Sequence, residues 1–153
     1  MNKFLFILFV SFSAFAWDSA PGNFTGKYKI IQSEVCSSFG LYYNCIVSSE
    51  LAGKTVEIVQ SKVNDEFIVC INKNFNDYLT NNHCYKNNSK ENMTLKISSS
   101  GFKAESTEVR NGRKVTSTYS NLTRSGTEFL LKDGGSVKEL FMYYNHTMEK
   151  VNN

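Results

Sequence analysis

The chain has 153 residues, of which 41% are hydrophobic and 20% are charged, and its formal net charge at pH 7 is +3. This length fits one domain with a single hydrophobic core. Basic and acidic side chains are interspersed along the chain, whereas nucleic-acid binding needs Lys and Arg gathered on one face, so we expect no nucleic-acid partner.

Residues 1–16 are predicted to be a secretory signal peptide. Lys3 precedes an apolar run that ends at Ala14-Phe15-Ala16, which gives the charged region, apolar region and small-residue cleavage site of such a peptide. The run is shorter than the stretch of about 20 residues that a membrane-spanning helix needs. We therefore expect a periplasmic or secreted protein with no transmembrane segment after signal cleavage; the alternative is an uncleaved N-terminal anchor. The cleavage site and the Asn-, Lys- and Phe-rich composition favour a bacterial source.

Residues 17–153 are predicted to form one β domain. Strand-like segments rich in Val, Thr, Tyr and Phe are separated by turn residues at short intervals. These segments are 26–36, 41–51, 54–62, 66–73, 92–100, 102–110, 113–123, 127–132 and 136–146. The long connection over residues 74–91 contains one predicted short helix, at residues 76–81.

Turns and alternation together predict the fold. Asn111-Gly112 is the clearest turn, because both residues tolerate the positive φ of a type I′ hairpin, and Gly134-Gly135 is the second. Apolar residues alternate with polar ones inside the segments, which is typical of strands with one buried face. A long meander leaves two open edges, and closure removes them. We therefore predict an all-β, single up-and-down antiparallel barrel of about eight strands, with a two-sheet sandwich as the alternative.

Four cysteines follow the signal peptide: Cys36, Cys45, Cys70 and Cys84. An even number in an exported protein favours disulfides, and four cysteines allow three connectivities. We expect Cys36–Cys45 and Cys70–Cys84, because each pair closes a short loop next to a strand end. A metal site that uses His83 beside Cys84 is the alternative, and the lack of any C-x-x-C pair disfavours it. No metal and no cofactor are predicted.

No catalytic residue is predicted. His83 and His146 are the two histidines, and neither lies in a nucleophile-elbow, metalloprotease or triad pattern. We expect both to be surface residues. Because the acidic side chains are scattered along the chain as well, a non-enzymatic role is predicted.

Five N-x-S/T sequons also occur, at Asn23, Asn87, Asn92, Asn121 and Asn145. In a chain so rich in Asn, Ser and Thr they are a small excess over chance. They would mark glycosylation sites in a eukaryotic source and carry no such meaning in a bacterial one.

Phe24-Thr25-Gly26-Lys27-Tyr28 resembles the start of the first barrel strand in the lipocalin and calycin superfamily, where a Gly, any residue and an aromatic residue open the barrel. The resemblance implies that Gly26 lets the chain turn tightly into the barrel and that Tyr28 packs at its base. A Gly ahead of an ordinary strand is the alternative explanation.

Ser125-Gly126-Thr127-Glu128-Phe129 is similar to the Ser-Gly-x-x-Tyr loop of periplasmic C-type lysozyme inhibitors, which are also small barrels with disulfides. Phe129 stands where that family has Tyr. The resemblance implies a protein-binding role, as an inhibitor of a secreted hydrolase. An ordinary Ser-Gly hairpin turn explains the same residues without any inhibitor.

The leading functional prediction is a carrier that holds a small apolar molecule inside the barrel. Small or polar residues such as Ser106, Ser117 and Ser120 stand where bulk is expected, which leaves room for a cavity. The predicted lining residues each share a period-two face with other apolar residues. They are Tyr43, Phe67, Val69, Leu95, Ile97, Tyr119 and Phe129. The alternatives are a protein-binding module, such as a hydrolase inhibitor, and a structural envelope component.

Overall fold

The structure, a computed structural model, describes residues 21–39, 42–75, 82–88, 90–137 and 140–152. The predicted signal peptide and the predicted helix at 76–81 lie outside these described residues. Within them the chain forms ten β-strands and one 3₁₀ turn, η1 (Ser49–Leu51). The strands are β1 (Gly26–Phe39), β2 (Tyr42–Val47), β3 (Thr55–Val63), β4 (Glu66–Lys73), β5 (His83–Lys86), β6 (Met93–Ile97), β7 (Gly101–Arg110), β8 (Arg113–Ser125), β9 (Glu128–Val137) and β10 (Leu140–Lys150).

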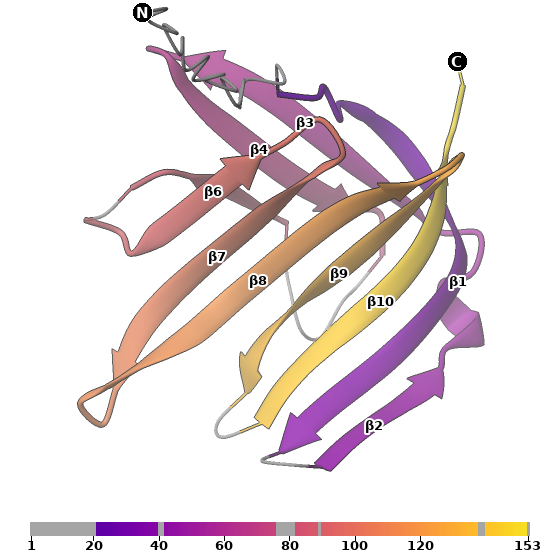
Figure 1. Ribbon diagram of the computed structural model, residues 1–153. Coiled ribbons are helices and arrows are strands. Elements are labelled where there is room, and N and C mark those ends of the chain that lie inside the picture. Colours follow the sequence, from indigo (N-terminus) through magenta and orange to yellow (C-terminus); the bar gives the residue numbers. More distant parts are fainter. Residues whose placement is uncertain (1–20, 40–41, 76–81, 89, 138–139, 153) are drawn as a thin grey trace, which may run out of the picture.

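Nine of these strands form an almost closed barrel (Figure 1). Their order is β5-β4-β3-β1-β10-β9-β8-β7-β6, and each neighbouring pair in this order is antiparallel. The two strands at the ends of the order are consecutive in the chain, and a single bridge between Asn88 and Met93 links β6 to the segment that follows β5. The predicted all-β antiparallel barrel is therefore confirmed, with nine strands around it.

The tenth strand, β2, lies outside this order. One edge of β1 pairs with β10, and the other edge is shared, because β3 pairs with residues 26–29 and β2 with residues 34–39. Figure 1 shows β2 and the turn between β7 and β8 at the end of the barrel away from the C-terminus. We call this the hairpin end and the opposite end the core end.

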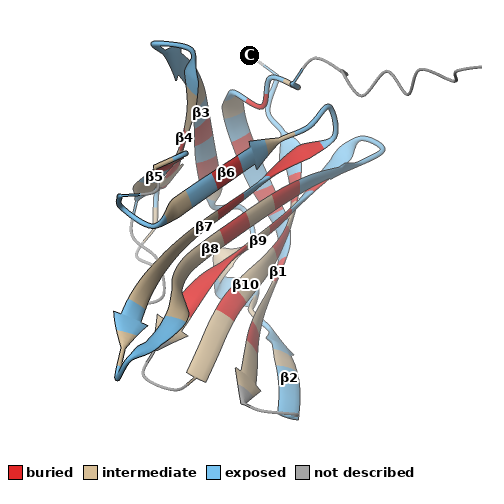
Figure 2. Cartoon of the chain, turned by 60° about the vertical axis from the view of Figure 1, so that its left-hand side comes forward, coloured by how far each residue is buried: buried red, intermediate tan, exposed pale blue. Residues whose placement is uncertain are grey.

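The hydrophobic core fills the core end of the barrel. Tyr28 is fully buried there: its ring packs edge-on against Phe129, with 5.0 Å between centroids, and its hydroxyl donates to the Phe24 carbonyl oxygen at 2.7 Å. Figure 2 shows that burial fades along β7 and β8 toward the hairpin end. The buried core side chains are Phe24, Tyr28, Ile30, Val56, Ile58, Val69, Ile71, Tyr85, Leu95, Phe102, Ala104, Leu122, Phe129, Leu131 and Met148.

Both disulfides join neighbouring strands. Cys36 on β1 bonds to Cys45 on β2, and Cys70 on β4 bonds to Cys84 on β5, in direct register in each case. The predicted neighbour pairing is confirmed. Because all four cysteines are bonded, Cys84 has no thiolate to offer to a metal ion.

The two turns predicted from glycine differ in outcome. Asn111 and Gly112 have positive φ values of 49° and 74° between β7 and β8, which confirms the predicted hairpin. The turn predicted at Gly134-Gly135 is wrong, since both residues lie inside β9. A Cβ atom at Gly134 would overlap the Met142 carbonyl oxygen on β10, and one at Gly135 would overlap a carbonyl oxygen on β8. These glycines allow close approach of three backbones, and the chain does not turn there.

Two predicted segments are also divided differently in the structure. The connection over residues 74–91 contains a strand, β5, that the sequence pattern does not predict. The predicted strand over residues 41–51 is split into β2 and η1, and only its first half pairs with β1. A four-residue strand is too short for alternation to be recognised, which explains the first difference.

Candidate functional site

Five of the seven predicted lining residues lie inside the barrel. Val69, Leu95 and Phe129 belong to the buried core, and Phe67 and Ile97 are partly buried against it. All five therefore contribute to the packing of the core end, where protein interiors are as dense as organic crystals.

Tyr43 and Tyr119 lie on the outer face. Successive side chains of a strand alternate between its two faces. Because Ser120 is fully buried inside the barrel, Tyr119 points outward, with its ring 6.4 Å from that of Phe141. Tyr43 is 62% exposed, and its ring lies 6.2 Å from that of Tyr143. These two tyrosines do not share a face with the other five predicted residues.

A buried polar cluster borders the core on the inside of the barrel. Lys73 Nζ contacts Asp133 Oδ2, and Ser120 Oγ donates a hydrogen bond to Asp133 Oδ1. The side chains of Lys73 and Asp133 are 1% and 0% exposed. Tyr85 Oη lies 3.0 Å from Ser120 Oγ, and His83 Nε2 lies 3.3 Å from the same oxygen. We call these five residues, from β4, β5, β8 and β9, the ion-pair cluster.

The electrostatics of this cluster favour a charged pair. Burial alone would raise the pKa of Asp133, but the charges of Lys73 and His83 and the hydrogen bonds from Lys73 and Ser120 hold that pKa below its usual value. Burial raises the pKa of the Tyr85 hydroxyl, which stays protonated. Asp133 is therefore a buried carboxylate whose charge depends on its ammonium partner.

The cluster contains Ser, His and Asp but does not have the geometry of a catalytic triad. In a triad the histidine bridges the two other groups through its two ring nitrogens. Here the Asp133 carboxylate itself accepts from Ser120, and it lies 3.8 Å from His83 Nε2, the nitrogen that already faces Ser120. The arrangement fits a hydrogen-bond network that neutralises a buried charge. No spacing in the sequence indicates it, because its members meet only when the barrel closes.

His146 is buried, which corrects the prediction that both histidines are surface residues. It is 1% exposed, its Nδ1 lies 3.0 Å from Ser33 Oγ on β1, and its ring stacks on Tyr144 at 5.3 Å between centroids. His83 is only partly exposed, at 19% of its side chain. His146 ends the predicted strand over residues 136–146, where a surface position is expected, whereas β10 continues to Lys150 and pairs along both edges.

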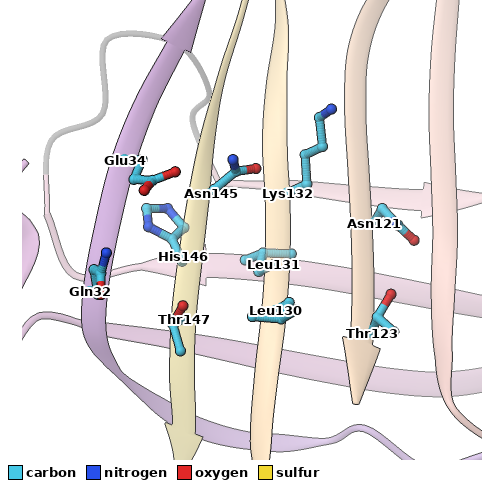
Figure 3. A pocket seen from close by; sticks show the side chains of 10 residues that line it. All are labelled: Gln32, Glu34, Asn121, Thr123, Leu130, Leu131, Lys132, Asn145, His146 and Thr147. Atoms are coloured by element: carbon cyan, nitrogen blue, oxygen red, sulfur yellow. The ribbon is translucent and has the colours of Figure 1, made fainter. Parts of the chain in front are cut away.

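The outer face of the barrel carries a pocket of about 440 Å³, which we call the outer groove. Figure 3 shows its side chains rising from four adjacent strands, β1, β10, β9 and β8. Leu131 and His146 also border it, although their side chains are buried on the inner side. The remaining lining residues are Gln32, Glu34, Asn121, Thr123, Leu130, Lys132, Asn145 and Thr147.

Strand register arranges the outer groove as two parallel rows. Each residue of a row is the direct partner of the next across the sheet. The first row is Glu34, Asn145, Lys132 and Asn121. The second row is Gln32, Thr147, Leu130 and Thr123. Two of the five sequons supply an Asn to the first row and a Thr to the second, because an N-x-T sequence in a strand places both residues on one face.

A row of aromatic side chains borders the groove on the hairpin side. Its members are Tyr43, Tyr143, Phe141 and Tyr119, with 5.9 to 6.4 Å between successive ring centroids. Tyr143 is almost fully buried, and Lys132 Nζ lies 3.7 Å from its ring centroid, so Lys132 lines the groove and also contacts the aromatic side chains. A cation–π contact of this kind is favourable. We call this set the aromatic row.

Strand β2 exposes an unusual amount of apolar surface. Tyr42 is 81% exposed, Tyr43 62%, Ile46 66% and Val47 64%. Its sequence, residues 42–47, has no charged residue and no proline. Among the described strands, β2 pairs only with β1, so its second edge has no strand partner there. The sequence pattern predicted a barrel strand over residues 41–51 and did not indicate that its side chains are exposed.

The loop that resembles lysozyme inhibitors is a tight turn. Gly126 has a φ of 63° between β8 and β9, and the neighbouring residues are exposed. Phe129, which stands at the aromatic position of the motif, is 9% exposed and packs on Tyr28 in the core. Its side chain is therefore packed in the hydrophobic core and does not belong to the exposed surface of the loop.

Three side chains of metal-binding type lie close together in the described part of the chain: the ligand atoms of Glu34, Cys36 and Cys45 are within 4.8 Å of one another. The two sulfurs are bonded to each other, and a metal ion requires a thiolate. Glu34 alone is left as a ligand, so these three residues do not make a metal site.

In the part of the chain that the structure describes, no helix has the length and apolar character to cross a membrane. Comparison with protein-family models, with curated proteins and with solved structures finds no match to the chain. The function must therefore be inferred from the barrel, its buried cluster and its outer surface.

Proposed function

We propose that the protein is a non-catalytic, exported binding module that recognises a protein partner through strand β2. The observation that carries this proposal is the exposure of four large apolar side chains on one short strand with a free edge. Exposed apolar surface that is concentrated on one element of a soluble protein commonly marks a binding site.

The free edge of β2 suits recognition of an extended segment. Edge strands are usually protected by charges, proline or bulges, and β2 has neither charge nor proline. A partner strand that pairs with this edge would gain main-chain hydrogen bonds, and alternate side chains would contact Tyr42 and Ile46 or Tyr43 and Val47. The Cys36–Cys45 disulfide holds β2 in register on β1, which lowers the entropy lost on binding.

Export supports the same proposal. Two disulfides are typical of proteins that fold in an oxidising compartment, and the predicted signal peptide directs the chain there. Both features support a periplasmic or secreted location. The barrel, with Tyr28 packed at its core end, also supports kinship with the lipocalin and calycin superfamily, whose first-strand pattern this chain resembles.

A carrier of a small apolar molecule is the second candidate. Small side chains line the inner face of β7 and β8 toward the hairpin end, where Ser106 Oγ and Ser117 Oγ lie 3.0 Å apart and both residues are half-buried. Bulky residues at these positions would fill more of the interior. The buried charges of Lys73 and Asp133 lie inside the same barrel, however, and an apolar ligand gains little from contact with them.

Site-specific photo-crosslinking tests the proposed function. Benzoylphenylalanine is placed at Ile46 or, as a matched control, at Val109, which is 68% exposed on β7, and the full chain is produced in its own host. We expect the Ile46 position to give one defined protein adduct that the Val109 position does not give. Adducts that are the same at both positions, or absent at both, would overturn the proposal. Thermal shift with fatty acids, retinoids and quinones tests the carrier separately.

A further inference from the structure

We propose that the outer groove is a binding site for an uncharged saccharide. This site goes beyond the proposed protein-binding role, since it uses other residues of the outer face. The inference rests on the juxtaposition of amide, hydroxyl and opposite charged side chains in two registered rows around one exposed leucine.

The hydrogen-bonding groups of the groove match those of a sugar. Gln32 and Asn121 each present an acceptor oxygen and a donor NH₂ group, and Thr123 and Thr147 each present a hydroxyl that donates and accepts. Asn145 Nδ2 donates one hydrogen bond to Cys36 Sγ at 3.5 Å, so Asn145 offers its acceptor oxygen and its second N–H. Sugar hydroxyls also donate and accept at the same atom. Five neighbouring side chains with both capacities can satisfy several adjacent hydroxyls at once, which neither an apolar ligand nor a simple anion requires.

The charges of the groove favour a neutral ligand. Glu34 and Lys132 lie in the same row, with Asn145 between them, so their charges offset one another. Lys132 Nζ also lies over the Tyr143 ring, 3.7 Å from its centroid, and is turned toward the aromatic row. A phosphate or other anion would meet one lysine and one carboxylate, which gives no net attraction.

Leu130 supplies the apolar contact that a sugar ring needs. It stands in the second row between Thr147 and Thr123, and it is 44% exposed. The C–H face of a pyranose ring can cover this side chain while the hydroxyls at its rim reach the amides and threonines on either side. The groove volume of about 440 Å³ also falls within the range of roughly 300–1,000 Å³ that is usual for small-molecule sites.

The groove is rigid enough to act as a site. Its side chains stand on four consecutive hydrogen-bonded strands of one sheet. In such a sheet, neighbours across strands are about 4.8 Å apart, and alternate residues along a strand are about 6.8 Å apart. The donors and acceptors are therefore fixed in a regular array before any ligand arrives, and little order is lost on binding.

A glycan array followed by calorimetry tests the inference. The fluorescently labelled full chain, with its disulfides formed, is applied to neutral oligosaccharides of glucose, mannose, galactose and N-acetylglucosamine and to a set of immobilised peptides. We expect binding to one class of neutral oligosaccharide. The variants Asn121→Ala and Asn145→Ala should each weaken it by about tenfold, which is the effect of one lost hydrogen-bonding group in a polar site.

Thr94→Ala and Asn152→Ala are the matched controls, because both residues are exposed outside the groove. Their affinity for the oligosaccharide should equal that of the unmodified chain, and circular dichroism should show all four variants folded. Failure of the folded, unmodified chain to bind any oligosaccharide would overturn the inference, as would equal affinities for groove and control variants. Binding to peptides that depends on Asn121 would assign the groove to a protein partner. The Ile46 crosslinking result is independent of all these outcomes.

Discussion

Replacing Lys73 with methionine should destabilise the protein severely at pH 7. The methionine has a similar length but leaves the Asp133 carboxylate, which is 0% exposed, without its ammonium partner. Breaking a buried ion pair in this way costs about 3–5 kcal/mol. The hydrogen bond from Ser120 to Asp133 remains and offsets part of the loss, so we expect the lower half of that range.

Urea unfolding followed by circular dichroism measures this effect. With a slope of about 1–3 kcal/mol per molar urea, a loss of this size lowers the midpoint by roughly 1 M or more. Lys62→Met is the matched control, because the Lys62–Asp65 pair lies at the surface, with the two side chains 51% and 96% exposed, and its loss should have no measurable effect. The double variant Lys73→Met/Asp133→Leu should recover most or all of the stability, since no buried charge is left.

The pH dependence gives a second test of the same reasoning. In the unmodified chain the pKa of Asp133 lies below its unfolded value, so its contribution to stability is present above about pH 4 and is lost as the pH falls through the folded-state pKa. In Lys73→Met, burial raises the pKa of Asp133 instead, and protonation relieves the penalty as the pH falls. The two stabilities should therefore converge as the pH is lowered from 7 to 4. A loss below about 1 kcal/mol, or a gap that does not change with pH, would refute the buried pair.

Two further predictions concern packing. Gly134→Ala should lower the free energy of unfolding by about 1–3 kcal/mol, because the new Cβ meets the Met142 carbonyl oxygen. An unchanged midpoint of urea unfolding would contradict the close approach. Tyr28→Phe should lower the free energy of unfolding by about 1–3 kcal/mol, because the buried carbonyl of Phe24 loses its 2.7 Å hydrogen bond. An unchanged midpoint of urea unfolding would show that this hydrogen bond does not stabilise the fold.

The strands and disulfides could be predicted from the sequence because they depend on local patterns. Asn111-Gly112 has one common use, the hairpin turn, and it is found there. The disulfides were predicted because their partners are only 9 and 14 residues apart in the chain, so that each pair closes a short loop next to a strand end. Gly134-Gly135 failed because glycine serves both turns and close backbone approach, and only the neighbouring strands distinguish the two.

The ion-pair cluster is built from residues that are distant in the chain, so it could not be predicted from the sequence. Lys73 and Asp133 are far apart in the chain and lie on β4 and β9, which are not neighbours in the sheet, so no spacing links them. Tyr119 was predicted to point inward from period-two alternation, and one slip in that count moves a side chain to the other face. Between Ser106 and Thr107 the partner on β8 steps from Thr118 to Thr116, so alternation counted along β8 across this bulge does not identify the inner face.

The pairing of β1 with β10 has a consequence for how the protein is made. Ser33 and His146 are partners across this seam although 113 residues separate them. The barrel therefore cannot close until the last strand has been synthesised, and contacts between such distant residues slow folding. If the predicted signal peptide directs export, this delay would keep the nascent polypeptide unfolded while it crosses the membrane. Closure and disulfide formation would then follow in the oxidising compartment.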